Sequence, residues 1–594
     1  MANATFTIRL IPNGNVRLCL RGHVAAWARA RQIVTEQTEQ AQLIGPDCLD
    51  VPWWELAPIF SQLGTIQRLF PDVKLDADEA TRKVISRSRE TSEQLVHIVE
   101  VESVPAEDIK KVLLEVGFTR VLTDKQLRNV GKLVALPNGA TFSVPGAGKT
   151  TEALATFSFK TRLNCRLLVV CPKNTFAAWE EQTAACLPQV PVTRLTGGQF
   201  EIERALAKKP PLALITYSQL TAVRDLIARS FAATAFVMFL DESHKIKGGE
   251  HRAWASAVLS ICHLPIWKLI MSGTPMPNVV ADLVPQIRFL YPGVVSIDDP
   301  VGIIQRIHVR TTKAELNLPP VECTGIPIPM TDAQARLYEL CASEVARDAE
   351  ASVRSLDKNA LRKLGKSYML LLQLVSNPAL LVSHQGRFNN QQLIECLHSD
   401  SPKIAYVCHR ARNLVAKGSK VLIWSGFVQN VEIIAGRLAD LGADFIHGAV
   451  EAGSEEEERT REFKIARFQS VKEGAMVLVA NPAACGEGIS LHQVCHHALY
   501  VDRNYNAAQF LQSQDRIHRY GLQKDIKTFI EYIYCPNTID ESVNRRLKAK
   551  VDRMEEVLKD SSINLPTHWL DDLDEIPDAE DVRDLLQTLK GNIV

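Results

Sequence analysis

Eight residues, SVPGAGKT at 143–150, have the composition of a phosphate-binding loop. Their small side chains leave backbone N–H groups free to surround phosphate oxygens, and the helix predicted to follow adds the positive end of its dipole. Lys149 is then placed to reach the β- and γ-phosphates of a nucleotide, and the Thr150 hydroxyl to bind Mg²⁺. The usual pattern has glycine where Ser143 stands, and a small residue there is compatible with the same turn.

An acidic pair, Asp241-Glu242, directly follows the apolar run FVMFL at 236–240. A carboxylate at the end of such a strand lies beside the phosphate loop in a doubly wound sheet. Asp241 is predicted to hold Mg²⁺ through its water shell, and Glu242 to orient and deprotonate the attacking water. The four letters DESH alone also fit a surface turn. Their place after a buried strand and downstream of GKT favours the catalytic interpretation.

Two further groups complete a predicted site for ATP. The Gln126 amide can donate and accept one hydrogen bond at the adenine edge, which would select ATP. Gln512, Arg516 and Arg519 are spaced i, i+4 and i+7, and are predicted to share one helix face. Guanidinium groups reaching the γ-phosphate from a second lobe would stabilise the transition-state charge and make hydrolysis depend on lobe closure.

The elements that must position these residues are short apolar strands alternating with helices. Two series of strands are predicted, at 167–171, 212–216, 236–240 and 269–272, and then at 421–424, 476–480, 498–501 and 528–534. Continuous Val, Ile and Leu runs are typical of parallel strands covered by helices on both faces. The sequence therefore predicts an α/β fold with two doubly wound parallel-sheet lobes, at 111–300 and 401–550. A helical region at 301–400 is predicted between them.

The two ends of the chain carry no recognisable motif. Residues 1–110 are predicted to form a small α+β accessory domain that opens on a hairpin around Asn13-Gly14. A sensor of DNA structure is the alternative interpretation of this domain. Residues 551–594 are rich in Asp and Glu and are predicted to form a solvated acidic tail. The alternative for the tail is that it folds over a DNA-binding groove as a duplex mimic.

Composition limits the possible partners. The 594 residues include 68 Lys and Arg and 68 Asp and Glu, so a DNA-binding surface has to be a local groove. The 13 cysteines include no C-x-x-C pair, which indicates buried thiols in a reducing compartment rather than zinc ribbons. The sequence shows no signal peptide and no apolar run of membrane-spanning length. We expect an intracellular protein, cytoplasmic in a bacterium or a virus-infected host and nuclear in a eukaryote.

These motifs together resemble the Swi/Snf (sucrose non-fermenting) family of helicase-like ATPases of superfamily two. The resemblance covers residues 117–550. It rests on segments that occur in the family's order: CPKNTFAAWEEQ with Trp179, DESHKIKG, MSGTPMPN, VRTTKAELNLPP, KVLIWSGF, ANPAACGEGISL, QSQDRIHRYGLQK and NTIDESVNRRL. One departure is Asn504-Tyr505-Asn506, which stands where the family usually has Trp-Asn-Pro.

The resemblance implies two RecA-like lobes and an ATP-dependent motor that translocates on double-stranded DNA, including forked or branched DNA, with ATP and Mg²⁺ as its cofactors. Other proteins are expected to bind through residues 1–110. The nucleotide contacts expected from the motifs are Gln126, Pro145, Gly146, Ala147, Gly148, Lys149, Thr150, Thr151, Gly488 and Gln512. The expected catalytic residues are Lys149, Asp241, Glu242, Arg516 and Arg519, with Mg²⁺ at Thr150 and Asp241. The DNA-backbone contacts that the resemblance implies are Lys173, Asn174, Thr216, Gly486 and Ser490, and Ser272 and Thr274 would link the ATP and DNA sites.

Two other functions remain open from the sequence. A helicase that separates the strands of DNA or RNA would be distinguished by a strand-displacement assay. A nucleic-acid-binding scaffold with a decayed ATPase is disfavoured because the phosphate-loop lysine, the acidic pair and both arginines are intact. A nuclease has no support, since no second group of carboxylates has metal-site spacing.

Overall fold

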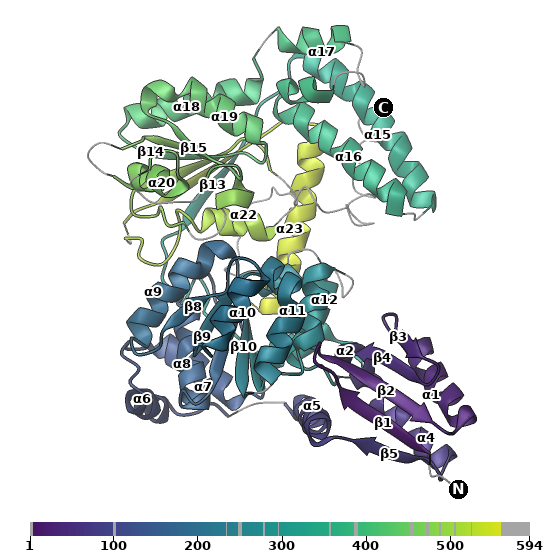
Figure 1. The fold of residues 1–594 in the computed structure, drawn as a ribbon. Helices are drawn as coiled ribbons and strands as arrows, with labels where there is room; N and C mark the ends of the chain where they lie inside the picture. Colours follow the sequence, from purple (N-terminus) through teal and green to yellow (C-terminus); the bar gives the residue numbers. More distant parts are fainter. Residues whose placement is uncertain are drawn as a thin grey trace. The chain divides into compact units, whose positions relative to one another are not determined.

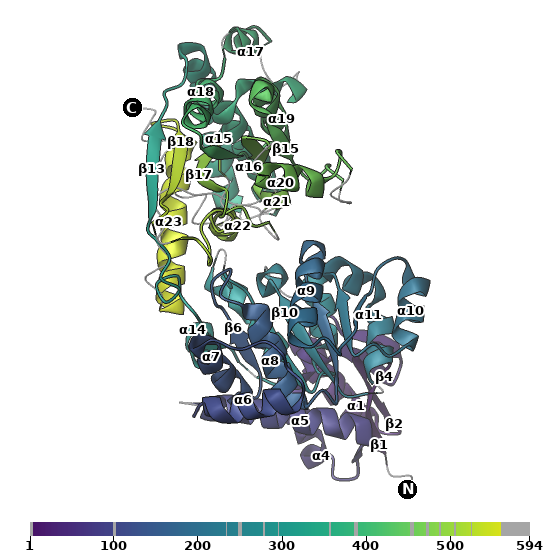
Figure 2. The ribbon, with the colours of Figure 1, turned by 90° about the vertical axis from the view of Figure 1, so that its left-hand side faces the viewer.

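The computed structural model describes residues 4–559, apart from short segments within that range. Those segments are 99–101, 233, 248–251, 277–278, 295, 356–357, 385–389, 399, 452–456, 471–473, 486–488, 504–506 and 524. Contacts divide the chain into two compact units, Met1–Thr312 and Lys313–Val594. Figure 1 shows the elements of each unit with their labels, and Figure 2 shows the same elements turned by 90°.

The first unit begins with a five-stranded mixed sheet in the order β3-β4-β2-β1-β5 (Figure 1). Its strands are β1 (Thr5–Leu10), β2 (Asn15–Arg21), β3 (Gln42–Gly45), β4 (Cys48–Pro52) and β5 (Lys74–Ala77). Its helical elements are α1 (Val24–Gln37), α2 (Trp53–Leu56), η1 (Ala57–Ile59), α3 (Phe60–Leu63), α4 (Thr65–Leu69) and α5 (Glu79–His97). The hairpin around Asn13-Gly14 is confirmed, with Gly14 at φ +87° in its turn. The α+β character expected for this segment is present.

A disulfide bond in this sheet corrects the expectation that the cysteines are all ordinary thiols. Cys19 on β2 lies opposite Cys48 on β4 in an antiparallel pair, their Cα atoms are 4.2 Å apart, and their sulfurs are joined. The other eleven cysteines are thiols outside any disulfide bond. The two sulfurs are 29 residues apart in the sequence. Only the pairing register of β2 and β4 brings the two cysteines together, so the disulfide bond could not be predicted from their spacing in the sequence.

The second part of the first unit is a seven-stranded sheet in the order β12-β6-β11-β10-β7-β9-β8, parallel throughout. Its strands are β6 (Gly139–Thr141), β7 (Arg166–Val170), β8 (Val192–Arg194), β9 (Leu212–Ile215), β10 (Phe236–Asp241), β11 (Trp267–Met271) and β12 (His308–Val309). The four predicted strands are confirmed as β7, β9, β10 and β11. The strands β6, β8 and β12 have three residues or fewer and were missed, because so short a segment shows no periodicity.

Helices on both faces of this sheet complete the first lobe (Figures 1 and 2). They are α6 (Ala106–Glu115), α7 (Asp124–Ala135), α8 (Lys149–Thr161), η2 (Lys173–Thr175), α9 (Phe176–Cys186), α10 (Gln199–Ala207), α11 (Tyr217–Ala232), η3 (Ser243–Ile246), α12 (Ala253–Ile261), η4 (Val280–Leu283), α13 (Val284–Leu290) and α14 (Pro300–Ile307). Every residue of β10 is buried, as expected of a central strand covered on both faces.

The N-terminal domain is attached to the first lobe through a buried contact. Trp53, fully buried, stacks on the His263 ring with their centroids 4.9 Å apart. Arg87 on α5 donates to the carbonyl oxygens of His263 at 2.6 Å and Leu264 at 3.2 Å. Burial lowers the pKa of His263 well below its ordinary value, so its ring is neutral at pH 7 and can stack without a charge. The domain therefore belongs to the first compact unit.

Next to this contact, Lys268 on β11 is almost completely buried, and we expect it to make stability depend on pH. Burial lowers its pKa from 10.5 to about 7. The unfolded chain keeps the proton up to about pH 10.5 while the folded chain releases it near pH 7, so stability should rise as pH increases between these values. Lys268→Met should remove this dependence and be more stable than the wild type at pH 7 by on the order of 3 kcal/mol.

Thermal unfolding of the full chain at pH 7, 8, 9 and 10 measures this effect as the difference in midpoint between Lys268→Met and the wild type. The difference should shrink steadily as pH rises. Lys111→Met is the matched control, because Lys111 is exposed on α6. A midpoint difference that stays constant over this range would show that Lys268 is charged in the folded protein.

The second unit contains a six-stranded parallel sheet in the order β13-β18-β17-β14-β16-β15. Its strands are β13 (Val321–Pro327), β14 (Lys420–Trp424), β15 (Asp444–Ile446), β16 (Val477–Ala480), β17 (Cys495–Tyr500) and β18 (Thr528–Tyr534). The second predicted series is confirmed as β14, β16, β17 and β18. The strand β13 lies in the region predicted to be helical, and Figure 2 shows it beside β18 at the edge of the sheet. The predicted α/β fold with two parallel-sheet lobes is confirmed.

Helices surround this sheet and extend away from it. They are α15 (Asp332–Ser355), α16 (Lys358–Ser376), η5 (Pro378–His384), α17 (Asn390–Leu397), α18 (Pro402–Ala416), α19 (Val428–Arg437), η6 (Ala439–Leu441), α20 (Arg461–Gln469), α21 (Pro482–Cys485), α22 (Ala507–Gln514) and α23 (Ile539–Leu558). The helices α15 and α16 pack along one another as a pair (Figure 1). Residues 551–558 of the predicted acidic tail belong to α23, and residues 560–594 lie outside the described part of the chain.

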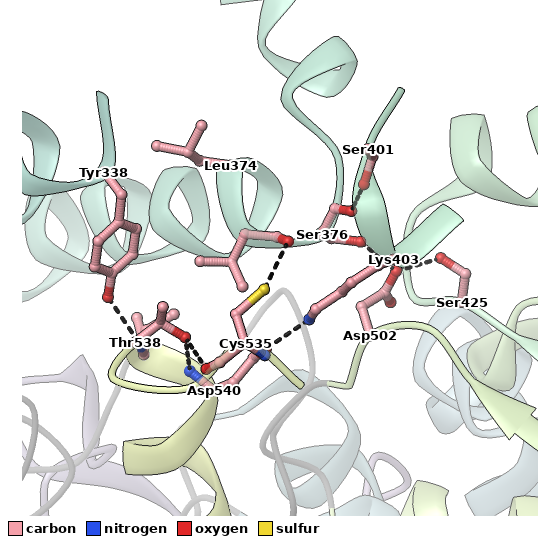
Figure 3. A network of polar contacts seen from close by, with 12 residues as sticks. Tyr338, Leu374, Ser376, Ser401, Lys403, Ser425, Asp502, Cys535, Thr538 and Asp540 are labelled. Carbon is pink, nitrogen blue, oxygen red and sulfur yellow. Dashed lines mark hydrogen bonds and ion pairs between the residues drawn. The ribbon is translucent and has the colours of Figure 1, made fainter. Parts of the chain in front are cut away.

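A buried polar network joins the end of α16 to the ends of two strands (Figure 3). The Asp502 carboxylate accepts hydrogen bonds from Ser376 at 2.7 Å, from Ser425 at 2.6 Å and from the Gly426 backbone N–H at 2.6 Å. Close by, Lys403 on α18 forms a buried ion pair with Asp540 in the first turn of α23. These contacts fix α16, α18 and α23 against the sheet. No helix in the described ranges is long and apolar enough to span a bilayer.

Candidate nucleotide-binding site

The phosphate loop joins β6 to α8 with two glycines in left-handed backbone conformations. Gly146 has φ +85° and Gly148 has φ +90°, a region that favours glycine. A Cβ atom at Gly148 would lie 2.3 Å from Gln126 Nε2, so no side chain fits there. Lys149 begins α8, and its Nζ donates to the Ser143 carbonyl oxygen at 2.8 Å across the loop. The Lys149 ammonium group therefore lies across the loop from its first residue.

Ser143, the departure from the usual glycine, has a defined structural use. Its hydroxyl oxygen accepts the backbone N–H of Thr311 at 3.0 Å, and the Thr311 carbonyl accepts the N–H of Val144 at 3.0 Å. Thr311 lies just before the boundary between the two units. The strand that enters the phosphate loop is thus hydrogen-bonded to the segment by which the chain leaves the first unit.

Beneath the loop, the fully buried carboxylate of Glu152 on α8 belongs to the same network. Asn129 donates from Nδ2 to Glu152 at 2.8 Å and to Thr311 Oγ1 at 3.0 Å, and Thr141 donates to Glu152 at 3.0 Å. Burial raises the pKa of Glu152 to about 7, against the opposing effects of these hydrogen bonds and of the nearby Lys149 charge. The sequence did not predict this network, because 182 residues separate Asn129 from Thr311 and each is an ordinary polar residue by itself.

The acidic pair lies at the carboxyl end of β10, two strands from β6. Glu242 has the left-handed conformation, with φ +50° and ψ +53°, which is rare for a residue with a side chain. Its Oε2 lies 3.4 Å from His244 Nδ1, and the same nitrogen lies 3.0 Å from Ser272 Oγ. Burial lowers the pKa of His244 well below its ordinary value, so the ring is neutral.

The turn at residues 272–274 also reaches the phosphate loop. A Cβ atom at Gly273 would lie 3.1 Å from Pro145 Cδ and 3.9 Å from Lys149 Nζ. Ser272 Oγ accepts the N–H of Thr274 at 3.1 Å. The phosphate loop, the acidic pair and this turn therefore form one continuous site at the carboxyl edge of the first sheet.

Gln126 lies beside this site and makes two contacts within the protein. Its Oε1 accepts the Thr123 N–H at 3.0 Å, which closes a capping box at the start of α7. Its Nε2 lies 3.4 Å from the Ala147 carbonyl oxygen, which it contacts as a donor. An amide has two N–H groups and two acceptor lone pairs, so the hydrogen bonds expected to adenine remain compatible with these contacts.

The residues present fit a magnesium nucleotide. The left-handed glycines 146 and 148 give the loop the tight turn typical of phosphate-binding loops, and Thr274 Oγ1 is buried without a hydrogen-bond partner next to the loop. The predicted Mg²⁺ ligands, the Thr150 hydroxyl and the Asp241 carboxylate, are the oxygen donors that Mg²⁺ prefers. Within the described ranges no cluster of three or more His, Cys, Asp and Glu side chains is suited to a metal.

In the second unit, the structure corrects the expectation that Gln512, Arg516 and Arg519 share one helix face. The helix α22 ends at Gln514, and the two arginines lie in the turns after it. The backbone tightens there, with the Arg516 N–H donating to the Ser513 carbonyl three residues back. The Arg516 guanidinium donates to two carbonyl oxygens, those of Gln512 and Ile489, each at 2.9 Å.

The carbonyl contacts of Arg516 explain why the helix stops where it does. The buried side chain satisfies the Gln512 carbonyl, which a continuing helix would use for the N–H of residue 516. Arg519 is partly exposed, and burial lowers its pKa while the Asp515 charge raises it. The expected nucleotide contact Gly488 lies outside the described residues. The roles of Gln512 and both arginines stay predictions.

The residues expected to contact DNA occupy the ends of adjacent strands in the first lobe. Lys173 and Asn174 lie in η2 after β7, and Thr216 caps α11 after β9 by accepting the Gln219 N–H at 3.1 Å. The strands β7 and β9 are neighbours, so these residues share the carboxyl edge of the sheet. In the second unit the Ser490 hydroxyl lies 3.0 Å from His492 Nδ1, and the expected contact Gly486 falls outside the described residues.

Comparison with known proteins places this site in a family. Residues 121–299 match the model of the SNF2-related domain. The ISWI chromatin-remodeling complex ATPase ISW2 of Saccharomyces cerevisiae is 24% identical over 472 residues, which cover 72% of this chain and 40% of that protein. The transcription regulatory protein SNF2 of the same yeast is 22% identical over 75% of this chain and 28% of its own. The chain thus spans less than half of the length of these two relatives.

This chain covers a larger share of a third relative, and two solved structures resemble part of this chain. The ATP-dependent DNA helicase DDM1 of Arabidopsis thaliana is 24% identical over 80% of this chain and 67% of that protein. Two structures of the Sulfolobus solfataricus SWI2/SNF2 ATPase core, one in complex with dsDNA, are 20% and 19% identical, with TM-scores of 0.33 and 0.31. They cover 75% and 76% of this chain and 94% of each core. The match of residues 121–299 to the SNF2-related domain and the similarity to these sequence relatives confirm the family resemblance predicted from the sequence.

Proposed function

We propose that this protein is an ATP-dependent motor that moves along double-stranded DNA and remodels DNA or protein–DNA complexes. The observation that carries the proposal is the continuous site in the first lobe. There the phosphate loop, the acidic pair and the 272–274 turn are linked through Lys149, His244 and Ser272. These parts together support the binding and hydrolysis of a nucleoside triphosphate.

Each part of the site has a role in hydrolysis. Lys149 and the loop amides hold the phosphates, and Thr150 and Asp241 hold the ion, which when bound neutralises charge on the β- and γ-phosphates. Glu242 orients the attacking water and takes its proton. The neutral His244 contacts both Glu242 and Ser272, so it connects the catalytic carboxylate to the turn. Arg516 and Arg519 are proposed to stabilise the transition-state charge from the second lobe.

DNA is the proposed track for two reasons. Two of the relatives described above are named as a chromatin-remodeling complex ATPase and an ATP-dependent DNA helicase. The chain itself presents Lys173, Asn174 and Thr216 at one edge of the sheet, as backbone-phosphate contacts require. Such contacts carry no sequence information, so we propose binding to duplex DNA of any sequence, including forked or branched DNA. The eukaryotic sources of these relatives favour the nuclear location over the cytoplasmic one.

ATPase assays with different nucleic acids test this proposal. Duplex DNA should stimulate hydrolysis more than single-stranded DNA or RNA does. Raising the salt concentration from 50 to 200 mM should weaken the apparent DNA affinity by at least about tenfold, since phosphate contacts release counterions. Lys149→Ala serves as the catalytically dead control. Stimulation by RNA alone would overturn the assignment of DNA as the track.

A second pair of assays separates the motor from a strand-separating helicase, which the name of one relative also suggests. Displacement of a third strand from a triplex reports movement along an intact duplex, and displacement of a strand from a fork reports unwinding. We expect the first activity without the second. Fork unwinding at a comparable rate would make the protein a helicase. DNA binding without ATP hydrolysis would make it a scaffold.

A further inference from the structure

Three hydrogen bonds hold Asp241 in place, two at its carboxylate and one at its backbone carbonyl. Trp179 on α9 donates its indole Nε1–H to Oδ2 at 2.9 Å. The backbone N–H of Glu242 donates to Oδ1 at 3.0 Å, and the Tyr217 hydroxyl donates to the Asp241 carbonyl oxygen at 2.8 Å. Both carboxylate oxygens and the backbone at the end of β10 are therefore fixed before any ligand binds.

The topology of the sheet brings these groups together. The strands β9, β7 and β10 are neighbours, and α11 and α9 follow β9 and β7 at the same carboxyl edge that holds Asp241. Trp179 is only 1% exposed and Asp241 8%. Trp179 packs with Phe176 and Cys171 in the core of the lobe, so its ring cannot turn away without disturbing that core.

The chemistry of an indole suits this position. Its N–H is a single neutral donor, and a hydrogen bond from it to a carboxylate is charge-assisted. A lysine or arginine in the same place would also orient the carboxylate, but its positive charge would oppose the binding of a divalent cation. The rigid ring fixes the direction of the Asp241 lone pairs and leaves the negative charge of the group intact.

We infer that Trp179 is a positioning residue for Asp241, which sets the orientation of the carboxylate and thereby the affinity of the nucleotide site for its divalent cation. This inference rests on the proposed function, in which Asp241 holds the cation. Tyr217 supports the same arrangement through the Asp241 backbone. Trp179 does not touch the nucleotide, so its loss should alter the dependence on the cation more than the binding of the nucleotide.

Trp179→Phe tests this, because it removes the N–H and keeps a large aromatic ring. The Mg²⁺ concentration that gives half-maximal ATPase activity should rise about tenfold, the effect expected for a lost hydrogen bond to a charged group. Binding of ATP in EDTA should stay within about twofold of the wild type. Trp267→Phe is the matched control: Trp267 is a buried tryptophan of the same lobe whose Nε1 makes no hydrogen bond.

The outcomes separate the inference from the function on which it rests. A wild-type protein without Mg²⁺-dependent ATPase activity would contradict the proposed function. An active wild type with the same Mg²⁺ dependence in Trp179→Phe, or an equal shift in Trp267→Phe, would contradict the role of Trp179 alone. If Trp179→Phe fails to fold, Tyr217→Phe removes only a hydroxyl group and should raise the half-saturating Mg²⁺ concentration in the same direction. An unchanged value in that variant would equally overturn the inference.

Discussion

Replacement of Glu242 by glutamine is expected to lower ATP turnover by at least about 100-fold, while ATP and Mg²⁺ still bind. The amide has the size of the carboxylate but cannot take a proton from the attacking water. Glu242 has a left-handed backbone, and its carboxylate contacts the neutral His244 ring, which in turn contacts Ser272 in the turn next to the phosphate loop. Single-turnover hydrolysis and equilibrium nucleotide binding, measured on the same preparation, separate the two effects.

Glu180→Gln provides the control for this experiment. Glu180 lies on α9 in the same lobe and pairs with Arg194 at the surface, so the substitution changes the same chemical group away from the site. It should leave turnover within about twofold of the wild type, because a surface ion pair contributes little to the stability of the fold. DNA-stimulated turnover near the wild-type level in Glu242→Gln would mean that another group activates the water.

The second large effect is expected in the second unit, where Lys403→Met should destabilise the fold by about 3–5 kcal/mol. Lys403 Nζ and Asp540 Oδ2 are 2.5 Å apart, with only 1% and 8% of the two side chains exposed (Figure 3). Removal of the lysine leaves a buried carboxylate without its counter-ion. That carboxylate also accepts the Cys535 N–H at 2.8 Å, so it cannot leave the interior without breaking the start of α23.

Denaturant unfolding followed by circular dichroism measures this loss, and two further variants establish its cause. Lys403→Met combined with Asp540→Asn should recover most of the stability, because no charge is then buried and the Cys535 N–H keeps an acceptor. Lys527→Met removes an exposed pair with Glu322 and should change stability by less than about 1 kcal/mol. A loss in the double variant as large as in Lys403→Met would assign the effect to packing instead of charge.

Much of the fold could be predicted because central parallel strands leave a direct trace in the sequence. The strands β7, β10, β14 and β16 are nearly all buried, so each reads as a continuous apolar run. The edge strands leave no such trace. In β13, half-buried and exposed positions are mixed, and its place in the sheet follows from pairing with β18 about 200 residues later. Pairing between distant segments is a property of the fold and not of a local sequence window.

The candidate site was predictable to the extent that its chemistry is local. The phosphate loop and the acidic pair are each contained in a few consecutive residues, and the structure places them in one site. The helical spacing of Gln512, Arg516 and Arg519 was misleading as to their shared helix face, because α22 ends at Gln514 and the Arg516 guanidinium donates to carbonyl groups near the end of the helix. Side-chain contacts that compete with the backbone are not visible in residue spacing.

The hydrogen bonds between Ser143 and Thr311 have a consequence for how this sequence can change. A shared set of buried hydrogen bonds joins Thr311, Asn129 and Glu152 to Ser143 and to one another. The residue type at each of these positions therefore limits which residue types can occupy the others. A return of position 143 to the glycine of the common motif would leave a buried donor unsatisfied. The four positions should therefore be inherited as a set. If the family consensus were introduced into this loop one residue at a time, the single variants would be less stable than both the starting protein and the protein with all the changes.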